Sequence, residues 1–317
     1  MVTLLAEHAV TIADEKALSE VYMFKGHAGT KPCALCKNLV DHRSSYAEND
    51  TTATLLPLTD LSYENWTRTT DVRVKQTLRR LGDLWRQHQL GHVSAAACAA
   101  ATQIAGWNYN AHHIMLHPTL DFKFAIAVYY DWMHIWCVDG VFSRELTALL
   151  SHRPSAFTCR DLHNYLMRWV WPRGQASGAR VFECGRYSGT ASETLSSAPV
   201  LAKFVRDVVM PLKIPELQAS LHSFLCCCKT LALLNAGRRG ATSPEELFAS
   251  TMAFLTAHQL AYGTEHWAWK HHAATHVPDM WKRSGVLLNC WVHERKHKLV
   301  KRFVQNRKIQ QGMNAVS

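Results

Sequence analysis

The chain has 317 residues, with 35 Lys and Arg against 25 Asp and Glu, which gives a formal net charge of +10. Because 48% of the residues are hydrophobic and only 19% are charged, the chain can bury a sizeable core, and this excludes an intrinsically disordered tail. The length predicts two domains, or one domain with a large insertion. The basic balance favours a polyanionic partner but does not identify it.

The ten cysteines and the N-terminus bear on the compartment. Cys226, Cys227 and Cys228 are consecutive in an apolar helical stretch, so their side chains point in different directions, unlike those of a disulfide framework. The first ten residues lack a basic region followed by an apolar run, so no signal peptide is expected. No stretch of about 18 apolar residues is present, so no transmembrane helix and no membrane partner are expected. A reducing compartment is therefore predicted.

The first part of the chain predicts a strand, a helix and a turn, in that order. Residues 2–12 predict a short strand that leads to Asp14, and residues 14–24 predict a helix with one apolar side. The sequence KGHAGTKP at residues 25–32 predicts a turn, because it is rich in Gly and Pro. The motif CALC follows this turn directly.

Two helices are predicted next. Residues 71–89 predict a basic amphipathic helix, because apolar residues recur along it at spacings of four, three and four. These apolar residues are Val74, Leu78, Leu81 and Trp85. Residues 93–104 are rich in alanine, which favours a helix.

The second half of the chain is predicted to be mainly helical after one buried strand. Residues 124–130 (FAIAVYY) predict a central strand, since the run is short and entirely apolar. Ser243, followed by Pro244 and Glu246, predicts the start of a helix. Residues 172–197 are rich in Gly, Ser and Arg and predict a loop.

Asp131 is the first candidate for chemistry. It follows the predicted strand at residues 124–130, and the carboxyl ends of strands are where α/β sheets carry functional groups. His134 lies three residues later. The alternative is that Asp131 only caps the next helix.

The CALC motif is a candidate metal site. Thiolates at the spacing of Cys33 and Cys36 can share one zinc ion. A second CxxC motif is absent, so the other ligands must come from elsewhere, and His42, His134 or His297 could supply them. The alternative is a pair of ordinary buried thiols.

Histidines also crowd residues 267–276. A histidine-rich metal centre is one interpretation of this segment. The sequence HWAWKHH has no carboxylate at ligand spacing, so these histidines are interpreted as core or surface residues.

Glu294 lies in a basic segment near the end of the chain. On a helix, Glu294 and His297 share a face. Four basic residues near them are Lys296, Lys298, Lys301 and Arg302. The alternative is a solvated basic helix with an ordinary Glu–Lys pair. The basic residues of the helix at residues 71–89, among them Arg79 and Arg80, could likewise form only its solvated face.

The order of these motifs carries a resemblance to a known family. Asp14, KGHAGTKPCALC, YYDWMHIW and NCWVHERKH follow one another as in the catalytic core of eukaryotic DDE/D cut-and-paste transposases of the CACTA and PIF/Harbinger type. The resemblance also includes Lys270 and His272, and it spans residues 10–303.

The resemblance implies an α/β, ribonuclease H-like fold, in which helices flank a central mixed sheet and a large all-α insertion precedes the last catalytic Glu. Residues 1–150 would then form the first part of the core with the CxxC zinc element, and residues 151–284 the helical insertion. Residues 285–317 would form the terminal core helix with Glu294 and a basic tail.

The resemblance also implies the chemistry. Asp14, Asp131 and Glu294 would bind two Mg²⁺ or Mn²⁺ ions and catalyse cleavage and strand transfer of DNA phosphodiesters. A structural zinc ion would be held by Cys33, Cys36, His134 and His297. DNA contacts would come from Arg79, Arg80, Lys296, Lys298, Lys301 and Arg302. A nuclear location and self-association are expected as well.

Two other functions stay open. Members of this family carry an N-terminal DNA-binding domain that has no counterpart before Asp14, which favours a fragment or a domesticated copy. Such a copy could be a catalytically inactive DNA-binding or assembly protein of transposon origin. The third function, unrelated to transposition, is a zinc-stabilised helical scaffold.

Overall fold

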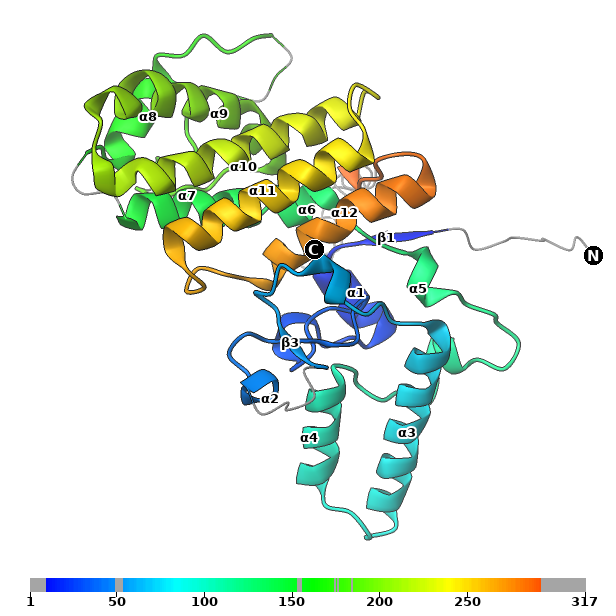
Figure 1. The fold of residues 1–317 in the computed structure, drawn as a ribbon. Helices are drawn as coiled ribbons and strands as arrows, with labels where there is room; N and C mark the ends of the chain where they lie inside the picture. Colours follow the sequence, from blue (N-terminus) through cyan, green and yellow to red (C-terminus); the bar gives the residue numbers. More distant parts are fainter. Residues whose placement is uncertain are drawn as a thin grey trace, which may run out of the picture.

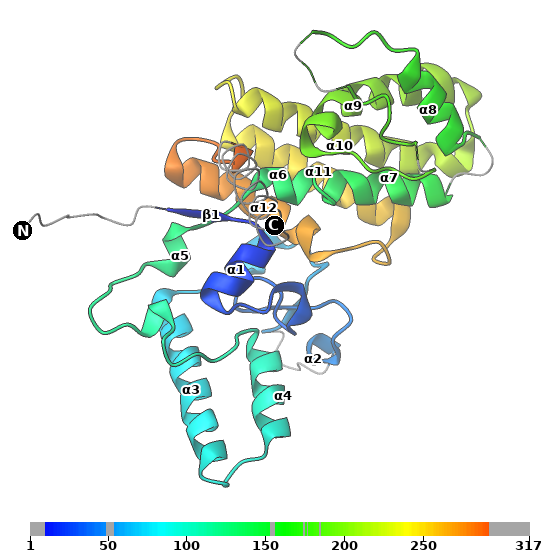
Figure 2. The same cartoon turned by 180° about the vertical axis from the view of Figure 1, so that it is seen from behind.

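The computed structural model describes residues 10–48, 54–152, 156–173, 175, 177–183 and 185–291. A helical bundle forms one end of the molecule, and a hairpin of two helices projects from the other end (Figures 1 and 2). Short strands and a central helix lie between them. The candidate functional residues gather in this middle layer.

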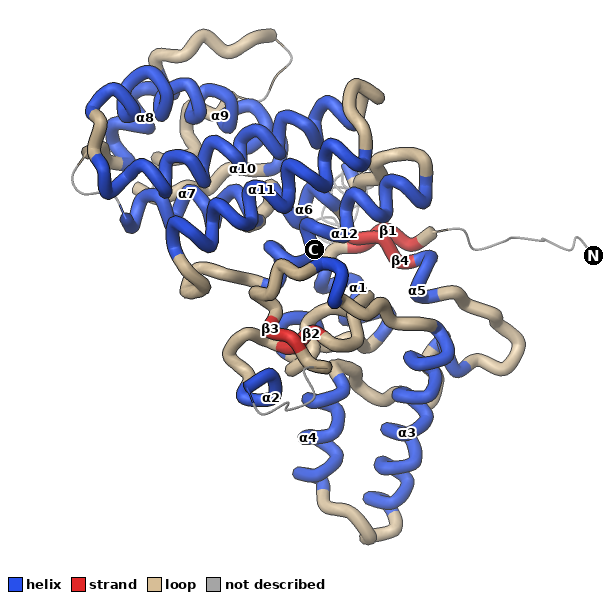
Figure 3. The backbone as a smooth tube through the Cα atoms, viewed as in Figure 1, coloured by secondary structure: helices blue, strands red, loops and turns tan. Residues whose placement is uncertain are grey.

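Two small parallel sheets lie in the middle layer (Figure 3). Strand β1 (Thr11–Ala13) pairs with β4 (Val128–Tyr130), and β2 (Leu39–Val40) pairs with β3 (Leu56–Pro57). The rest of the described chain is mainly helical, which confirms an α/β, helix-rich fold. The described residues do not form a wider mixed sheet, so the ribonuclease H-like arrangement stays a prediction.

The predicted strand at residues 124–130 is only partly a strand. Its first four residues form a helical turn, α5 (Phe124–Ala127), and only the last three form β4. The cause is a distant residue: the carboxylate of Asp71 accepts a hydrogen bond from the amide of Ala125 at 2.8 Å and so favours the turn. The strand predicted at residues 2–12 is described from residue 10 onward and forms β1.

Helix α1 (Glu15–Tyr22) follows β1 directly and confirms the helix predicted there. Asp14 caps it, since its Oδ1 accepts a hydrogen bond from the amide of Ala17 at 2.7 Å. Leu18 and Tyr22 bury the apolar side of the helix.

The projecting hairpin consists of α3 (Asp71–Gln89) and α4 (Ala95–Ala105), as the periodicity and the alanine content predict. Val74, Leu78 and Leu81 are buried against the body of the protein. The turn at residues 25–32 holds the base of α4, because the amide of Lys25 donates to the carbonyl of Gly106 at 2.9 Å. The amide of Thr30 donates to the carbonyl of Gln103 at 3.0 Å.

The bundle consists of α7 (Val141–His152), α8 (Cys159–Met167), α9 (Ala191–Phe204), α10 (Gln218–Gly237) and α11 (Pro244–Tyr262). Helix α11 begins where predicted, because the Ser243 hydroxyl accepts from the amide of Glu246 at 3.1 Å. Helix α9 begins inside the predicted loop, where Thr190 and Glu193 form a capping box.

Several shorter elements and the central helix complete the fold. The central helix is α12 (Trp269–Ser284), which packs against β4, the bundle and α6. The short elements are α2 (Ser45–Glu48), α6 (Trp132–Trp136), η1 (Gly26–Ala28), η2 (Tyr63–Asn65), η3 (Ile114–Leu116), η4 (Val205–Val209), η5 (Met210–Leu212) and η6 (Pro215–Leu217).

One helical run bears on the expectation that the chain has no transmembrane helix. Residues Pro215–Gly237, which form η6 and α10, are long and apolar enough to cross a membrane by length and composition. Its polar residues are scattered through the run, so it contains no unbroken apolar stretch of about 18 residues. Buried residues make up 56% of its most apolar window, and the core helix of a soluble protein passes the same test.

We expect Gly106→Ala to destabilise the protein more than Gly91→Ala. Both glycines have a left-handed φ, +74° and +79°, which costs any L-residue roughly 1–2 kcal/mol. A Cβ at residue 106 would also lie 2.7 Å from the carbonyl oxygen of Lys31, whereas residue 91 has open space around it. The additional strain at residue 106 should cost about 1–3 kcal/mol, measured by urea unfolding. Equal losses for the two variants would contradict the close approach of Lys31 to α4.

Candidate metal centre

Four buried side chains converge in the middle layer. Cys33 and Cys36 belong to the loop before β2, and His272 and His276 lie one turn apart on α12. One potential ligand atom from each residue lies within 4.8 Å of the others. The Nε2 atom of His276 is 3.2 Å from the sulfur of Cys33, 3.6 Å from that of Cys36 and 2.9 Å from Nε2 of His272. These four residues are called the Cys₂His₂ group below.

Backbone hydrogen bonds hold the cysteine loop in place. The amide of Lys37 donates to the carbonyl of Thr67, and the amide of Thr69 donates to the carbonyl of Leu35, both at 2.9 Å. The CxxC segment is therefore paired with residues 67–69 on both sides of Cys36. This pairing directs both sulfur atoms toward α12.

The protonation states of the group suit a cation. Burial alone would raise the pKa of Cys33, but a hydrogen bond from Cys36 and the nearby rings of His276 and His272 outweigh it and bring the pKa well below its ordinary value. The hydrogen bond to Cys33, and then burial, raise the pKa of Cys36. Burial lowers the pKa of His276 to about 4, so its ring is neutral at pH 7 and offers a lone pair.

The donor set fits zinc. Two thiolates and two imidazoles are a common tetrahedral zinc ligand set. In this structure the two Nε2 atoms face each other and the sulfurs, an arrangement of lone pairs that a cation would stabilise. The Nδ1 atom of His272 is buried and has no hydrogen-bond partner among the described residues. The group can therefore bind a metal such as zinc.

A second layer of polar residues surrounds the group on one side. Arg68 contacts Nδ1 of His276, pairs with Asp279, and lies 3.7 Å from the sulfur of Cys36. Tyr63 accepts from Arg68 at 3.0 Å and donates to Asp279 at 2.6 Å. The Arg68 guanidinium thus supplies positive charge beside the thiols, as outer-shell residues of metal sites do.

The structure alters the predicted ligand set. Cys33 and Cys36 belong to the group, but His134 does not, because its Nδ1 lies 2.5 Å from Oδ2 of Asp131. His297 lies outside the described residues. The interpretation of the histidines at residues 267–276 as only core or surface residues is corrected for His272 and His276. Their spacing of four residues on a helix was the signal that could have identified them.

The two predicted catalytic aspartates lie at one edge of the β1–β4 pair. Ala13 pairs with Tyr130, so Asp14 and Asp131 each follow the end of one of two adjacent parallel strands. Asp131 caps α6: its Oδ1 accepts from the amides of Met133 and Cys290, both at 3.3 Å. The cap agrees with the alternative noted for Asp131 and leaves its catalytic role a prediction.

The remaining predicted residues divide into two sets. Arg79 and Arg80 are exposed on α3, in the projecting hairpin. The others lie outside the described residues; they are Glu294, Lys296, Lys298, Lys301 and Arg302.

We expect the purified protein to bind about one zinc ion per chain, because it has one described group of this kind. Cys33→Ser and His276→Asn should each weaken binding by more than the roughly 10–100-fold that loss of an outer-shell partner costs. Metal analysis and the absorption spectrum of the cobalt-substituted protein measure this. His134→Asn and Cys159→Ser are matched controls and should retain the metal. Loss of the metal in His134→Asn would contradict the Cys₂His₂ group and support the ligand set predicted from the sequence.

Comparison of the chain with models of known families, with curated proteins and with solved structures finds no match. The function is therefore inferred from the residues described above: the Cys₂His₂ group, the two aspartates beside the β1–β4 pair, and the basic surface of the hairpin.

Proposed function

We propose that the protein acts on DNA as a metal-dependent phosphodiesterase and strand transferase, similar to a DDE transposase with a ribonuclease H-like core. One observation carries the proposal. The parallel register of β1 and β4 brings Asp14 and Asp131 to the same edge of the strand pair. Paired carboxylates at such an edge are suitable ligands for divalent cations.

The residues at this edge fit a hard cation. Asp14 and Asp131 offer carboxylate oxygens, and the resemblance adds Glu294, which lies outside the described residues. When bound, two Mg²⁺ or Mn²⁺ ions would polarise the phosphodiester and activate the attacking water or hydroxyl. His134 lies against Asp131 and is 23% exposed, so its side chain stands between the buried carboxylate and solvent.

The neighbouring Lys270 supports a negatively charged edge. Burial lowers the pKa of Lys270, and the charges of Asp139, Glu15 and Asp14 act in the opposite direction. Its ammonium donates to the carbonyls of Val138 and Asp139 at 3.0 and 2.9 Å. Lys270 therefore joins α12 to the loop after α6, close to the aspartates.

A zinc ion in the Cys₂His₂ group would brace this edge. Tyr130, the residue before Asp131, places its hydroxyl 3.8 Å from the sulfur of Cys33. Its amide lies 3.2 Å from the sulfur of Met280 on α12. The strand that ends at Asp131 thus contacts both the CxxC loop and the helix that carries the histidines. We infer a structural role for zinc, which would hold Asp131 in position.

The proposal implies DNA as the partner, self-association, and a nuclear location. The formal charge of +10 supports a polyanionic partner. The alternative is a catalytically inactive DNA-binding or assembly protein of transposon origin, or a zinc-stabilised helical scaffold. The burial of Asp131 favours this alternative, because its side chain is 0% exposed and already accepts two amide hydrogen bonds.

Asp131→Asn tests the catalytic proposal. Asparagine also caps helices, so the change removes the charge while keeping the cap. We expect Mg²⁺-dependent nicking of supercoiled DNA to fall at least about 100-fold, since a metal ligand contributes several kcal/mol to the transition state.

Asp139→Asn is the matched control for this experiment. It removes the same charge a few residues away, and asparagine tolerates the left-handed φ of +45° at this position. It should retain nicking. No nicking by the wild-type protein, or equal nicking by wild type and Asp131→Asn, would overturn the catalytic proposal and leave the inactive alternative.

A further inference from the structure

Two neighbouring hollows lie at the base of the hairpin. The first, of about 580 Å³, lies between α3 and α4, and the second, also of about 580 Å³, lies beside β3. Both are lined by Lys31 and Arg73, so they lie next to each other. Arg80 lines the first hollow and Lys37 the second. The two hollows together are called the basic groove.

The basic groove is positively charged along its length. Its cations are Lys31, Lys37, Arg73 and Arg80. Among the described residues, no carboxylate lines either hollow, and none of these four cations forms an ion pair. Other basic residues of α3 differ, because Arg86 pairs with Asp83 at 2.9 Å and Lys75 lies 3.9 Å from Asp121.

Lys31 is fixed at the centre of the groove by the backbone. Its carbonyl packs against Gly106 at the end of α4, where even a Cβ would meet it at 2.7 Å. Lys31, Arg73 and Arg80 line the same hollow, and no described carboxylate lies among them. Their like charges repel one another across the groove, and a bound anion would relieve this repulsion.

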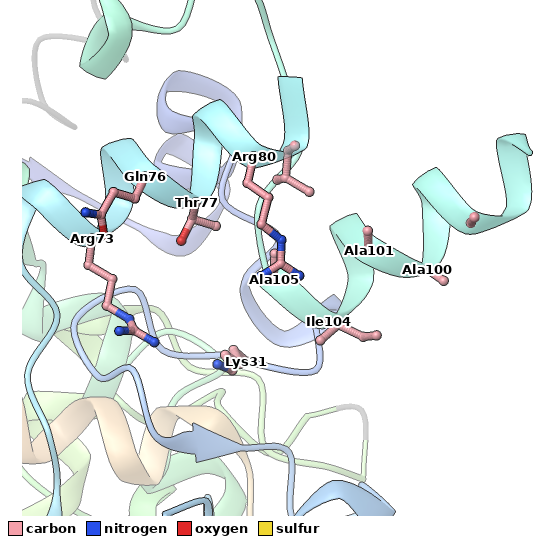
Figure 4. A pocket seen from close by; sticks show the side chains of 11 residues that line it. Lys31, Arg73, Gln76, Thr77, Arg80, Ala100, Ala101, Ile104 and Ala105 are labelled. Atoms are coloured by element: carbon pink, nitrogen blue, oxygen red, sulfur yellow. The ribbon is translucent and has the colours of Figure 1, made fainter. Parts of the chain in front are cut away.

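The walls of the groove differ in character (Figure 4). Arg73, Gln76, Thr77 and Arg80 project from α3 toward the groove, and Lys31 lies at its base. The α4 wall consists of small or apolar side chains. These are Ala97, Ala100, Ala101, Ile104 and Ala105. Charged and hydrogen-bonding groups thus face an apolar wall, which suits a chain of phosphates joined by sugar rings.

We propose that the basic groove binds the sugar–phosphate backbone of a nucleic acid. This inference deepens the proposed function, on which it rests for the identity of the polymer as DNA. The groove extends past Lys31 in both directions, so it fits a polymer better than a single phosphate. Residues of this kind contact phosphates without reading the sequence, so binding should depend strongly on salt and little on sequence.

The test compares the DNA affinity of the full chain and its variants by fluorescence anisotropy with a labelled duplex. We expect Lys31→Gln, Arg73→Gln and Arg80→Gln each to weaken binding about three- to tenfold. Each should also reduce the slope of log affinity against log salt by about 0.9, the value for one lost phosphate contact.

Two arginine variants serve as controls. Arg86→Gln removes the same charge from another residue of α3, which pairs with Asp83 and does not line the groove. Arg160→Gln changes an exposed arginine on α8, in the bundle. Both should bind DNA within about twofold of the wild-type protein, because neither would lose a phosphate contact. Equal losses in Arg86→Gln and Arg80→Gln would overturn the groove proposal and indicate only the diffuse charge of α3.

Two further comparisons distinguish DNA from a small phosphate as the ligand, and the groove proposal from the catalytic proposal. Inorganic phosphate and ATP should compete weakly with DNA; ATP binding that depends on Arg73 and Arg80, without DNA binding, would overturn the inference. If the groove variants bind DNA like the wild-type protein while Asp131→Asn alone loses nicking, the groove proposal is wrong and the proposed function stands. If the groove variants lose DNA binding but the wild-type protein does not nick DNA, the groove proposal stands and the catalytic proposal is wrong.

Discussion

The convergence of Cys33, Cys36, His272 and His276 is the constraint on which the rest of the structure depends. Two buried sulfurs and two buried ring nitrogens lie within 4.8 Å of one another, although the cysteines and the histidines are more than 230 residues apart in the chain. Burying such polar atoms without partners is costly, whereas a shared cation would turn all four into ligands. Any displacement of α12 would separate the histidines from the cysteine loop, so the group and the helix must form together.

Helix α12 transmits this constraint to both ends of the molecule. Lys270, at its start, bonds the carbonyls of the loop after α6, and Lys282, near its end, pairs with Glu245 of α11 at 2.8 Å. Arg283 donates to the carbonyl of Ala125 at 3.1 Å, beside the base of the hairpin. The bundle, the strand pair and α5, which Asp71 of the hairpin holds, therefore all contact one helix, whose position the Cys₂His₂ group fixes.

Local signals in the sequence predicted the helices well, and distant contacts account for what was missed. The start of α11 follows from Ser243 and the two residues after it, which act within one turn. The strand at residues 124–130 was half wrong because Asp71, more than 50 residues away, holds the amide of Ala125. The CxxC motif, which supplies the two cysteines of the Cys₂His₂ group, is likewise a local signal in the sequence. His272 and His276 have no carboxylate near them in sequence, because their partners are thiols from the other end of the chain.

A single short segment connects the three candidate sites. This segment begins at Asp14 and ends at Cys33. Within it, Lys31 lines the basic groove, and Cys33 belongs to the Cys₂His₂ group. The side chain of Glu15 accepts from the amide of His27 at 2.6 Å, which ties the turn at residues 25–32 to the first residue of α1. The aspartate edge, the groove and the thiols are thus held by one continuous piece of backbone, closed at its far end by the Cys₂His₂ group. A phosphate backbone bound at Lys31 would therefore lie at a fixed position relative to the carboxylates, and loss of the metal would disturb binding and chemistry together.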